Sequence, residues 1–396
     1  MHTADERRCA CGYDVMQPFG EVVSEELDYV PAVLRVIENV KLKYSCSRCH
    51  EAVVTVSAPE RPIPRIVASA GLLAHLVTSK FSYHLPLYRL EQMFEIQGSQ
   101  ISRKTTCGWL GATSELLEPI VIEIKRELVT EPLIQSDDTS IRYQDHQHRG
   151  TTSRGYLWAY SKPWAEVVFE FRTDRSRAGP LEFLAGYQGA VQAHGYAGYN
   201  ELFRRSGVVH VGCMAHVRRK IFESRQEYPE HAGLLLAGIQ RLYRIERGAK
   251  SDGITGERLV ELRRGEPLRV FGVLEEALTA MNGQVLPKSG FGKAIAYALD
   301  RWLSIVRYTE IAEAELDNNG CEKAIRPVAL GRRNWLFAGS ESGGHRAAIL
   351  FSLVTTCKRL GIEPTAYLTD VIARIGELTP RAWKAARRAC FKTGAG

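Results

Sequence analysis

The sequence predicts an α/β protein, in which a small zinc-binding β module and a helical region precede a sheet that is covered by helices and carries a helical insertion. Three observations predict this fold class. Four of the nine cysteines lie near the N-terminus. Apolar residues follow a helical period up to residue 128, and after Glu131-Pro132 they follow the period of strands. Strand-like runs then alternate with helix-like ones, an order that favours a sheet with packed helices.

The length and composition are typical of a globular protein with several domains. A chain of 396 residues exceeds what one core usually organises, so roughly two to four domains are expected. Hydrophobic residues make up 45% and charged residues 24%, which excludes a disordered or fibrous chain. No apolar run approaches the roughly 20 residues that cross a bilayer, and residues 1–8 carry charge without a following apolar core. We therefore expect a cytoplasmic protein with no membrane partner.

The basic residues are clustered along the chain. The net charge is +7, a modest excess, but many of the arginines and lysines are adjacent to one another. Clusters of this kind favour a polyanionic partner, although any single doublet is more often solvated surface. The clusters are Arg204-Arg205, Arg218-Arg219-Lys220, Arg332-Arg333, Lys358-Arg359 and Arg387-Arg388.

Residues 1–58 are predicted to form the β module, with zinc as its support. The stretch from Val22 to Tyr44 is rich in β-branched and aromatic residues, which are typical of strands. The odd total of cysteines argues against a secreted disulfide scaffold and favours metal binding. The four candidate zinc ligands are Cys9, Cys11, Cys46 and Cys49. The second pair has zinc-ligand spacing, but a single residue separates the first pair, so His2 or His50 is an alternative ligand.

The region from residue 66 to residue 128 is predicted to be helical, after a proline-rich linker at residues 57–64. A glycine turn and a candidate helix cap, Ser102, interrupt it. Arg103 and Lys104 follow on the next helix. Two interpretations stay open: a helix-turn-helix that reads DNA, and a helical bundle with an ordinary cap.

Residues 131–345 are predicted to form the sheet domain. The expected strands are residues 133–142, 155–161, 165–173, 190–194 and 208–211, with a helix at 180–187. Helical periodicity returns from about residue 221 to residue 310, which is too long for a connecting loop and predicts a helical insertion. Residues 346–396 are expected to form a C-terminal helical segment.

Three separated stretches are candidate pieces of one metal site. Two offer a carboxylate, Asp137 and Glu322, and the third offers His194 instead. In-line cleavage of a phosphodiester uses two divalent cations about 4 Å apart, and hard magnesium or manganese prefers oxygen ligands. Each carboxylate also has a plainer interpretation. An aspartate near a strand end is usually a turn or cap residue, and Glu322 has capping-box spacing from Asn319; Asp317 is predicted to form a turn.

Cys213 and His216 form a second candidate metal-ligand pair. The Cys-x-x-His spacing suits zinc, but two ligands do not make a site. The alternative is a buried thiol beside a hydrogen-bonded histidine. In either case we expect the pair to support the candidate centre structurally.

Several longer motifs resemble the transposases of the bacterial insertion-sequence family numbered sixty-six, in that family's order. The resemblance extends from Cys9 to about Asp370. The motifs are Leu85–Arg89, Gly155–Tyr160, Gly195–Tyr199, Gly212–Lys220, Asp317–Pro327 and Gly331–Ser340. Members of that family typically carry a helical segment before the cysteine module, so the resemblance implies either a truncation or an alternative start for this chain.

The resemblance implies a ribonuclease-H-like domain over residues 131–345 that uses an Asp, Asp, Glu triad with two magnesium ions to nick and join DNA ends. Carried over by position, Asp137 is the first aspartate and Glu322 is the glutamate. His194 stands at the position of the second aspartate. A neutral imidazole adds no negative charge beside two dications, so we expect weakened binding of at least one metal ion and severely reduced strand transfer. Glu201 is the alternative source of a carboxylate.

The resemblance also implies DNA as the partner: the element's terminal repeats and target DNA, bound by a homo-oligomer, with accessory proteins of the same element as further candidates. Arginine suits bidentate contact with phosphates, and an aromatic ring can stack on an unpaired base, although core packing is the commoner role of such rings. The candidate DNA contacts are Arg103, Lys104, Arg218, Arg219, Lys220, Arg326, Arg332, Arg333 and Trp335.

Two function classes fit these observations. One is a DNA transposase whose activity His194 impairs. The other is a catalytically inactive relic or repressor that still recognises the element's ends. Both predict the same DNA-binding features and differ at the metal site.

Overall fold

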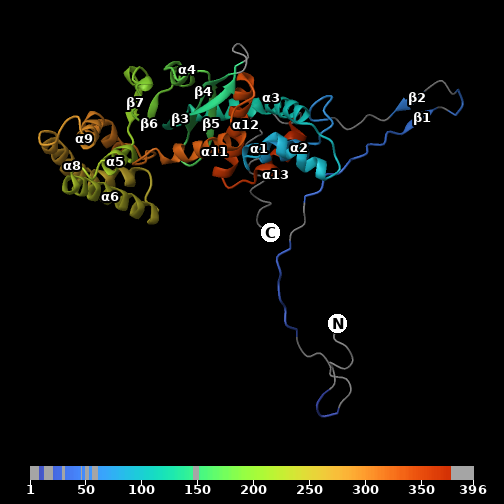
Figure 1. Cartoon of the computed structure of the whole chain (residues 1–396), viewed down its shortest axis with the longest axis horizontal. Coiled ribbons are helices and arrows are strands. Elements are labelled where there is room, and N and C mark those ends of the chain that lie inside the picture. The colour runs from blue at the N-terminus through green and yellow to red at the C-terminus, as the bar shows by residue number, and fades with distance from the viewer. Residues whose placement is uncertain are drawn as a thin grey trace. The chain divides into compact units, whose positions relative to one another are not determined.

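The computed structural model describes residues 9–12, 21–28, 32–45, 47–49, 53–55, 61–145 and 151–375. The chain divides into two units, residues 1–40 and residues 41–396. The second unit holds all the helices and strands that are labelled in Figure 1. Among the described residues, no helix combines the length and the apolar character that crossing a bilayer would need.

The N-terminal region has little regular structure in its described parts. The described residues between 9 and 40 contain no helix or strand, and the Sγ atoms of Cys9 and Cys11 lie 3.1 Å apart. Strand β1 (Lys43–Ser45) pairs antiparallel with β2 (Val53–Thr55). In the described part of residues 22–44, strand structure is therefore found at the end of the stretch, and most of the apolar side chains described before residue 43 are exposed. Cys46 lies outside the described residues.

The helical prediction for residues 66–128 is confirmed by α1 (Ala70–Phe81), α2 (Leu87–Ile96) and α3 (Arg103–Leu128). The predicted cap is also confirmed, since the Ser102 side chain accepts a hydrogen bond from Thr105 N at 3.1 Å. The side chain of Glu91 in α2 accepts a hydrogen bond from Arg103 N at 3.0 Å, which fixes α2 to the start of α3.

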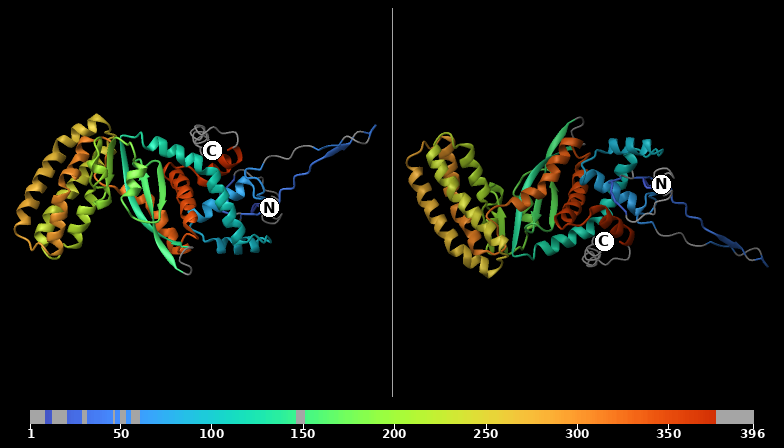
Figure 2. Two further views of the ribbon diagram at one scale, coloured as in Figure 1. Left: turned by 90° about the horizontal axis from the view of Figure 1, so that it is seen from above. Right: turned by 90° about the horizontal axis from the view of Figure 1, so that it is seen from below.

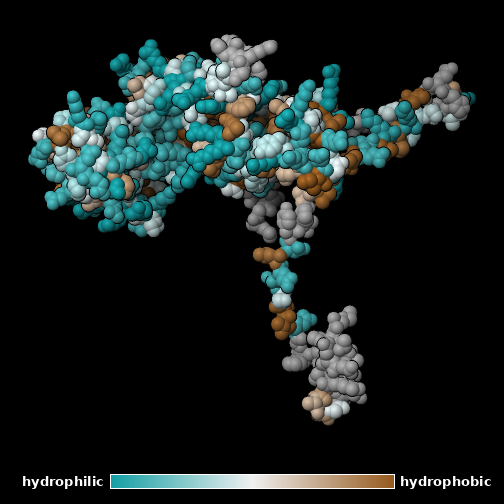
Figure 3. All heavy atoms as spheres, viewed as in Figure 1, coloured by the Kyte–Doolittle hydropathy of each residue, from teal (hydrophilic) through white to brown (hydrophobic). Residues whose placement is uncertain are grey.

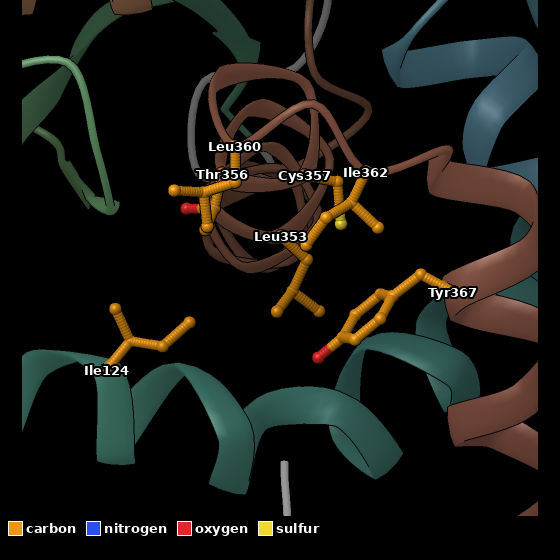
Figure 4. A pocket seen from close by; sticks show the side chains of 7 residues that line it. All are labelled: Ile124, Leu353, Thr356, Cys357, Leu360, Ile362 and Tyr367. Carbon is orange, nitrogen blue, oxygen red and sulfur yellow. The ribbon is translucent and has the colours of Figure 1, made fainter. Parts of the chain in front are cut away.

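Helices α1 and α3 pack against the C-terminal helices, α1 against both α12 (Glu341–Arg359) and α13 (Pro364–Arg374), and α3 against α12. Figure 4 shows a small pocket where α3 approaches both of them. The residues that line it are Ile124, Leu353, Thr356, Cys357, Leu360, Ile362 and Tyr367. The two predicted regions at residues 66–128 and 346–396 thus share one core, as far as residue 375, where the described structure ends.

A five-stranded mixed sheet has the order β5-β4-β3-β6-β7. The central strand β3 is antiparallel to β4 and parallel to β6, and β7 is parallel to β6. The strands are β3 (Leu133–Gln144), β4 (Thr152–Ser161), β5 (Val167–Arg172), β6 (Gly189–Ala193) and β7 (Val208–Val211). The α/β fold class and all five strands of the sheet domain are confirmed, and the predicted helix at 180–187 is shifted to α4 (Ala178–Phe183).

Helix α12 covers the edge strand β5. Hydroxyl groups of α12 accept hydrogen bonds from the strand's backbone, Ser352 Oγ from Phe169 N at 2.8 Å and Thr356 Oγ1 from Val167 N at 3.1 Å. These bonds satisfy two donors that an edge strand would otherwise leave unpaired. The C-terminal helix therefore closes this side of the sheet.

Helices fill the region where the insertion was predicted, and they share a core with the sheet. Its helices are α5 (Met214–Glu223), α6 (Pro229–Ser251), α7 (Glu257–Arg264), α8 (Glu266–Asn282), α9 (Gly290–Asp300) and α10 (Trp302–Val306). Phe271, Phe291 and Trp302 are buried in a cluster that also includes Val211 of β7. Both views of Figure 2 show the insertion helices on one side of the sheet and α12 on the other. The insertion surface that faces the viewer in Figure 3 is mainly hydrophilic.

Candidate metal centre

Asp137 lies on the central strand of the sheet. Its Oδ1 atom accepts a hydrogen bond from Asp138 N at 2.8 Å, and its side chain is 16% exposed. Strand β6 runs parallel to β3, with Ala193 opposite Ser136. The residue that follows β6, His194, therefore comes to lie beside the residue that follows Ser136, which is Asp137.

His194 and Asp137 are in direct contact, with 3.1 Å between His194 Nδ1 and Asp137 Oδ1. Burial lowers the pKa of His194, but the contact with the Asp137 carboxylate and the charge of Asp138 outweigh burial, so the pKa is raised above its usual value. Arg301 of the insertion donates a hydrogen bond to Gly195 O at 3.2 Å, which holds the turn after His194. The structure thus brings together the first and middle stretches of the predicted site.

Asp138 is held by an arginine that the sequence analysis did not identify. Arg175 donates to both carboxylate oxygens of Asp138, at 2.9 and 2.8 Å, and the Asp138 side chain is 3% exposed. The guanidinium of Arg175 also lies 4.1 Å from the centre of the Tyr196 ring. Burial raises the pKa of Asp138 even though Arg175 opposes that change. Both oxygens of Asp138 are therefore held by Arg175, and Asp138 could act as a metal ligand only if that pair were broken.

Helix α11 (Asn319–Trp335) carries Glu322 in its first turn. The helix start is tied to the sheet, because Asn318 Nδ2 donates to Ser136 O at 3.0 Å. Asp317 forms the predicted turn, since it accepts a hydrogen bond from Asn319 N at 2.9 Å. Tyr243 OH also donates to Asp317, at 2.8 Å.

The capping-box interpretation of Glu322 is wrong. The cap residue is Asn318, one residue before the predicted Asn319, and its side chain makes no capping hydrogen bond. Glu322 Oε1 is buried and accepts no hydrogen bond from any residue that the structure describes. Burial raises the pKa of Glu322, and the charge of Asp137 adds to that effect, so the two carboxylates interact electrostatically.

His216, with Cys213 beside it, links His194 to Glu322. Cys213 Sγ lies 3.3 Å from His216 Nδ1, and His216 Nδ1 lies 3.7 Å from Glu322 Oε1. The rings of His216 and His194 are nearly parallel, with 5.5 Å between their centres. Burial lowers the pKa of His216 to about 4, with Arg219 and His194 adding to the effect, and burial raises the pKa of the Cys213 thiol to about 12. Asp137, His194, His216 and Glu322 therefore form a continuous chain of contacts.

The donor set does not fit a pair of magnesium ions. Magnesium prefers oxygen ligands, and among the described candidate ligands the carboxylates of Asp137 and Glu322 are the ones that no arginine pairs with, whereas Arg175 holds Asp138. The remaining donors are two imidazoles and a thiol, which suit softer cations. Glu201 does not join the centre; its carboxylate pairs with Arg177 at 2.8 Å and is 45% exposed.

The candidate DNA-contacting residues differ in their surroundings. Most of them are exposed: Arg103, Lys104, Arg218, Arg219, Lys220, Arg326 and Arg333. Arg332 is half-buried and donates to Ser140 O at 2.5 Å and to Thr139 Oγ1 at 3.0 Å, so it joins α11 to β3. Trp335 is half-buried near Phe351, with 6.4 Å between the ring centres. The surroundings of these last two residues favour a structural role.

Comparison with known proteins matches three stretches of the chain to one family. Residues 65–346 match the family described as Transposase IS66 family. Residues 6–50 match the zinc-finger binding domain of transposase IS66, and residues 352–386 match the IS66 C-terminal element.

Two similar proteins come from Sinorhizobium fredii (strain NBRC 101917 / NGR234). The chain is 31% identical to uncharacterized protein y4jD over 94% of its own length and 75% of that protein. It is also 31% identical to uncharacterized protein y4hP, over 96% and 74% of the two lengths.

Proposed function

Because the chain belongs to the IS66 family of transposases, as its motifs predicted, we propose that it binds the ends of an insertion sequence and that His194 impairs the metal-dependent cleavage and joining of DNA. Asp137 and Glu322 are proposed as ligands of a divalent cation, magnesium or manganese. The proposed enzyme is thus a transposase of the Asp, Asp, Glu type in which one position is altered.

The observation that carries this proposal is the 3.1 Å contact between His194 Nδ1 and Asp137 Oδ1. A carboxylate at position 194 would add a negative charge and two oxygen donors beside Asp137. An imidazole adds one nitrogen donor and no negative charge, and it occupies part of the coordination space of Asp137. We therefore propose that this chain holds hard cations weakly at the centre.

A ribonuclease-H-like fold is proposed for residues 131–345. The strand order β5-β4-β3-β6-β7, with the first three strands antiparallel and the last two parallel to β3, supports it. So does the placement of the acidic residues, with Asp137 on the central strand and Glu322 on the helix after the insertion.

The N-terminal cysteines are proposed to bind zinc. The match of residues 6–50 to a zinc-finger domain supports a site formed by Cys9, Cys11, Cys46 and Cys49. The zinc finger and the basic start of α3, where Arg103 and Lys104 are exposed, would give the chain two separate segments that can contact DNA. A homo-oligomer on DNA, accessory proteins of the element and a cytoplasmic location remain predictions of the family assignment.

A relic or repressor that binds the element's ends without chemistry is the second candidate, and the commitment of Asp138 to Arg175 favours it. The variant Asp137→Asn distinguishes the two candidate functions. Binding and cleavage should be measured on DNA that carries the inverted repeats flanking the coding locus, by gel shift and by end cleavage with magnesium or manganese.

We expect the unaltered chain to bind these ends and to cleave them slowly. Asp137→Asn should remove the remaining cleavage and leave the affinity for DNA within about twofold, because one carboxylate is a small part of a phosphate-dominated interface. Cleavage that survives the substitution would contradict an enzymatic role for Asp137. A complete absence of cleavage in the unaltered chain would favour the repressor, and absence of binding would contradict both candidates.

A further inference from the structure

Three donors of different chemistry meet between β7 and α11, where the insertion begins. Cys213 ends the connection that follows β7, His216 lies in the first turn of α5, and Glu322 lies in the first turn of α11. Their ligand atoms all lie within 4.8 Å of one another. The fold thus brings a carboxylate to a thiol and an imidazole that lie more than a hundred residues earlier in the chain.

The spacing of these atoms suits one small cation. Around an ion with bonds of about 2.0–2.3 Å, tetrahedral ligand atoms lie about 3.3–3.8 Å apart. The distances are 3.3 Å from Cys213 Sγ to His216 Nδ1 and 3.7 Å from His216 Nδ1 to Glu322 Oε1. The cluster needs little rearrangement to close around such an ion.

Two further observations favour a ligand site at Cys213 over a thiol that is simply buried in the core. Glu322 Oε1 is buried without a hydrogen-bond donor among the described residues, which is costly for a carboxylate oxygen unless a cation satisfies it. The backbone N–H of Asn318 points at Cys213 Sγ at 3.3 Å, a bond that stabilises the thiolate form that a metal requires. If the Cys213 thiol only donated a hydrogen bond to His216, nothing would compensate the burial of Glu322 Oε1.

We propose that Cys213, His216 and Glu322 bind one zinc-class transition-metal ion, with a fourth position left for water or another donor. Sulfur and nitrogen donors select zinc or cobalt over magnesium. Because Glu322 is also a proposed ligand of the magnesium centre, zinc and magnesium would compete for it. This ion is separate from the zinc of the N-terminal module, and its binding requires neither DNA nor catalysis.

Cobalt(II) titration tests this site, because thiolate coordination to cobalt gives a charge-transfer band in the near ultraviolet. The full chain should carry Cys46→Ser and Cys49→Ser, so that the N-terminal module cannot supply two of its thiolates. We expect about one equivalent of cobalt to bind this parent chain and to produce the band. Adding Cys213→Ser should abolish the band, and His216→Ala or Glu322→Gln should weaken binding at least tenfold.

Two matched variants control for indirect effects. Cys321→Ser removes a buried thiol next to Glu322 that donates to Ala159 O, and Asp137→Asn removes the other carboxylate of the centre. Both should keep the cobalt band. Its absence in the parent chain, or its survival in a folded Cys213→Ser variant, would overturn the proposal. If Cys213→Ser does not fold, an unchanged cobalt affinity in His216→Ala overturns it instead.

Discussion

Replacing His194 by aspartate is expected to raise magnesium-dependent cleavage of the element's ends by roughly a hundredfold. The substitution supplies the second carboxylate beside Asp137 and removes the imidazole that now contacts Asp137 Oδ1 at 3.1 Å. Asp138 cannot supply this carboxylate in the unaltered chain, because both of its oxygens accept hydrogen bonds from Arg175. The measurement is the initial rate of end cleavage under saturating DNA and magnesium.

The matched control is His194→Asn, which has the size of aspartate but no charge. It should leave cleavage near the level of the unaltered chain, because it removes the imidazole without adding an anionic ligand. Strong cleavage by the unaltered chain, or equal gains from asparagine and aspartate, would refute the role assigned to position 194.

Replacing Arg263 by methionine is expected to lower the free energy of unfolding by about 3–5 kcal/mol. The Arg263 side chain is 2% exposed and pairs with Glu246, with contacts of 3.0 and 2.8 Å. It also donates to three backbone oxygens, Tyr308 O at 3.1 Å, Ile311 O at 2.9 Å and Ala314 O at 2.8 Å. Methionine fills similar volume but leaves Glu246 and these oxygens without their donor.

Chemical denaturation of the unaltered chain and the Arg263→Met variant measures this loss. Arg241→Met is the control, because Arg241 pairs with Glu266 at 2.7 Å on the surface, where the two side chains are 60% and 45% exposed. It should change the free energy of unfolding by less than about 1 kcal/mol. A similar loss of unfolding free energy in the two variants would contradict this prediction, because the buried network would then stabilise the fold no more than the surface pair does.

Arg263 also matters for the candidate centre. The backbone oxygens that it holds lie in the segment that leads to Asp317 and, five residues later, to Glu322. The helical insertion therefore supports the position of the glutamate from a distance, as Arg301 supports the turn after His194.

The strands and helices could be predicted because their periodicity is local. β3 to β7 and α1 to α3 lie where alternating or helical spacing of apolar residues placed them. The described residues between 22 and 42 form no strand, although their β-branched composition favoured one, because composition alone does not supply a partner layer. Packing of α3 against α12 joins residues more than two hundred positions apart, so no local pattern could reveal it.

The candidate centre was predicted in part. Asp137, His194 and Glu322 were identified from motifs; the structure places Asp137 against His194, and it places Glu322 in a neighbouring group with His216, whose ring stacks on that of His194. The capping box failed because Asn318 directs its side chain to Ser136 O on the sheet, a tertiary contact that overrides the local spacing. Arg175 was missed because nothing in its own surroundings on the chain marks it as the partner of Asp138.

The affinity of the centre for manganese tests the central claim most directly, because it needs no knowledge of the DNA ends. Free manganese can be counted by electron paramagnetic resonance while the ion is titrated into the unaltered chain and into His194→Asp. We predict that the variant binds manganese at least tenfold more tightly, and that adding Asp137→Asn removes the gain. Equal affinity in the unaltered chain and the variant would contradict the claim that His194 weakens this metal centre.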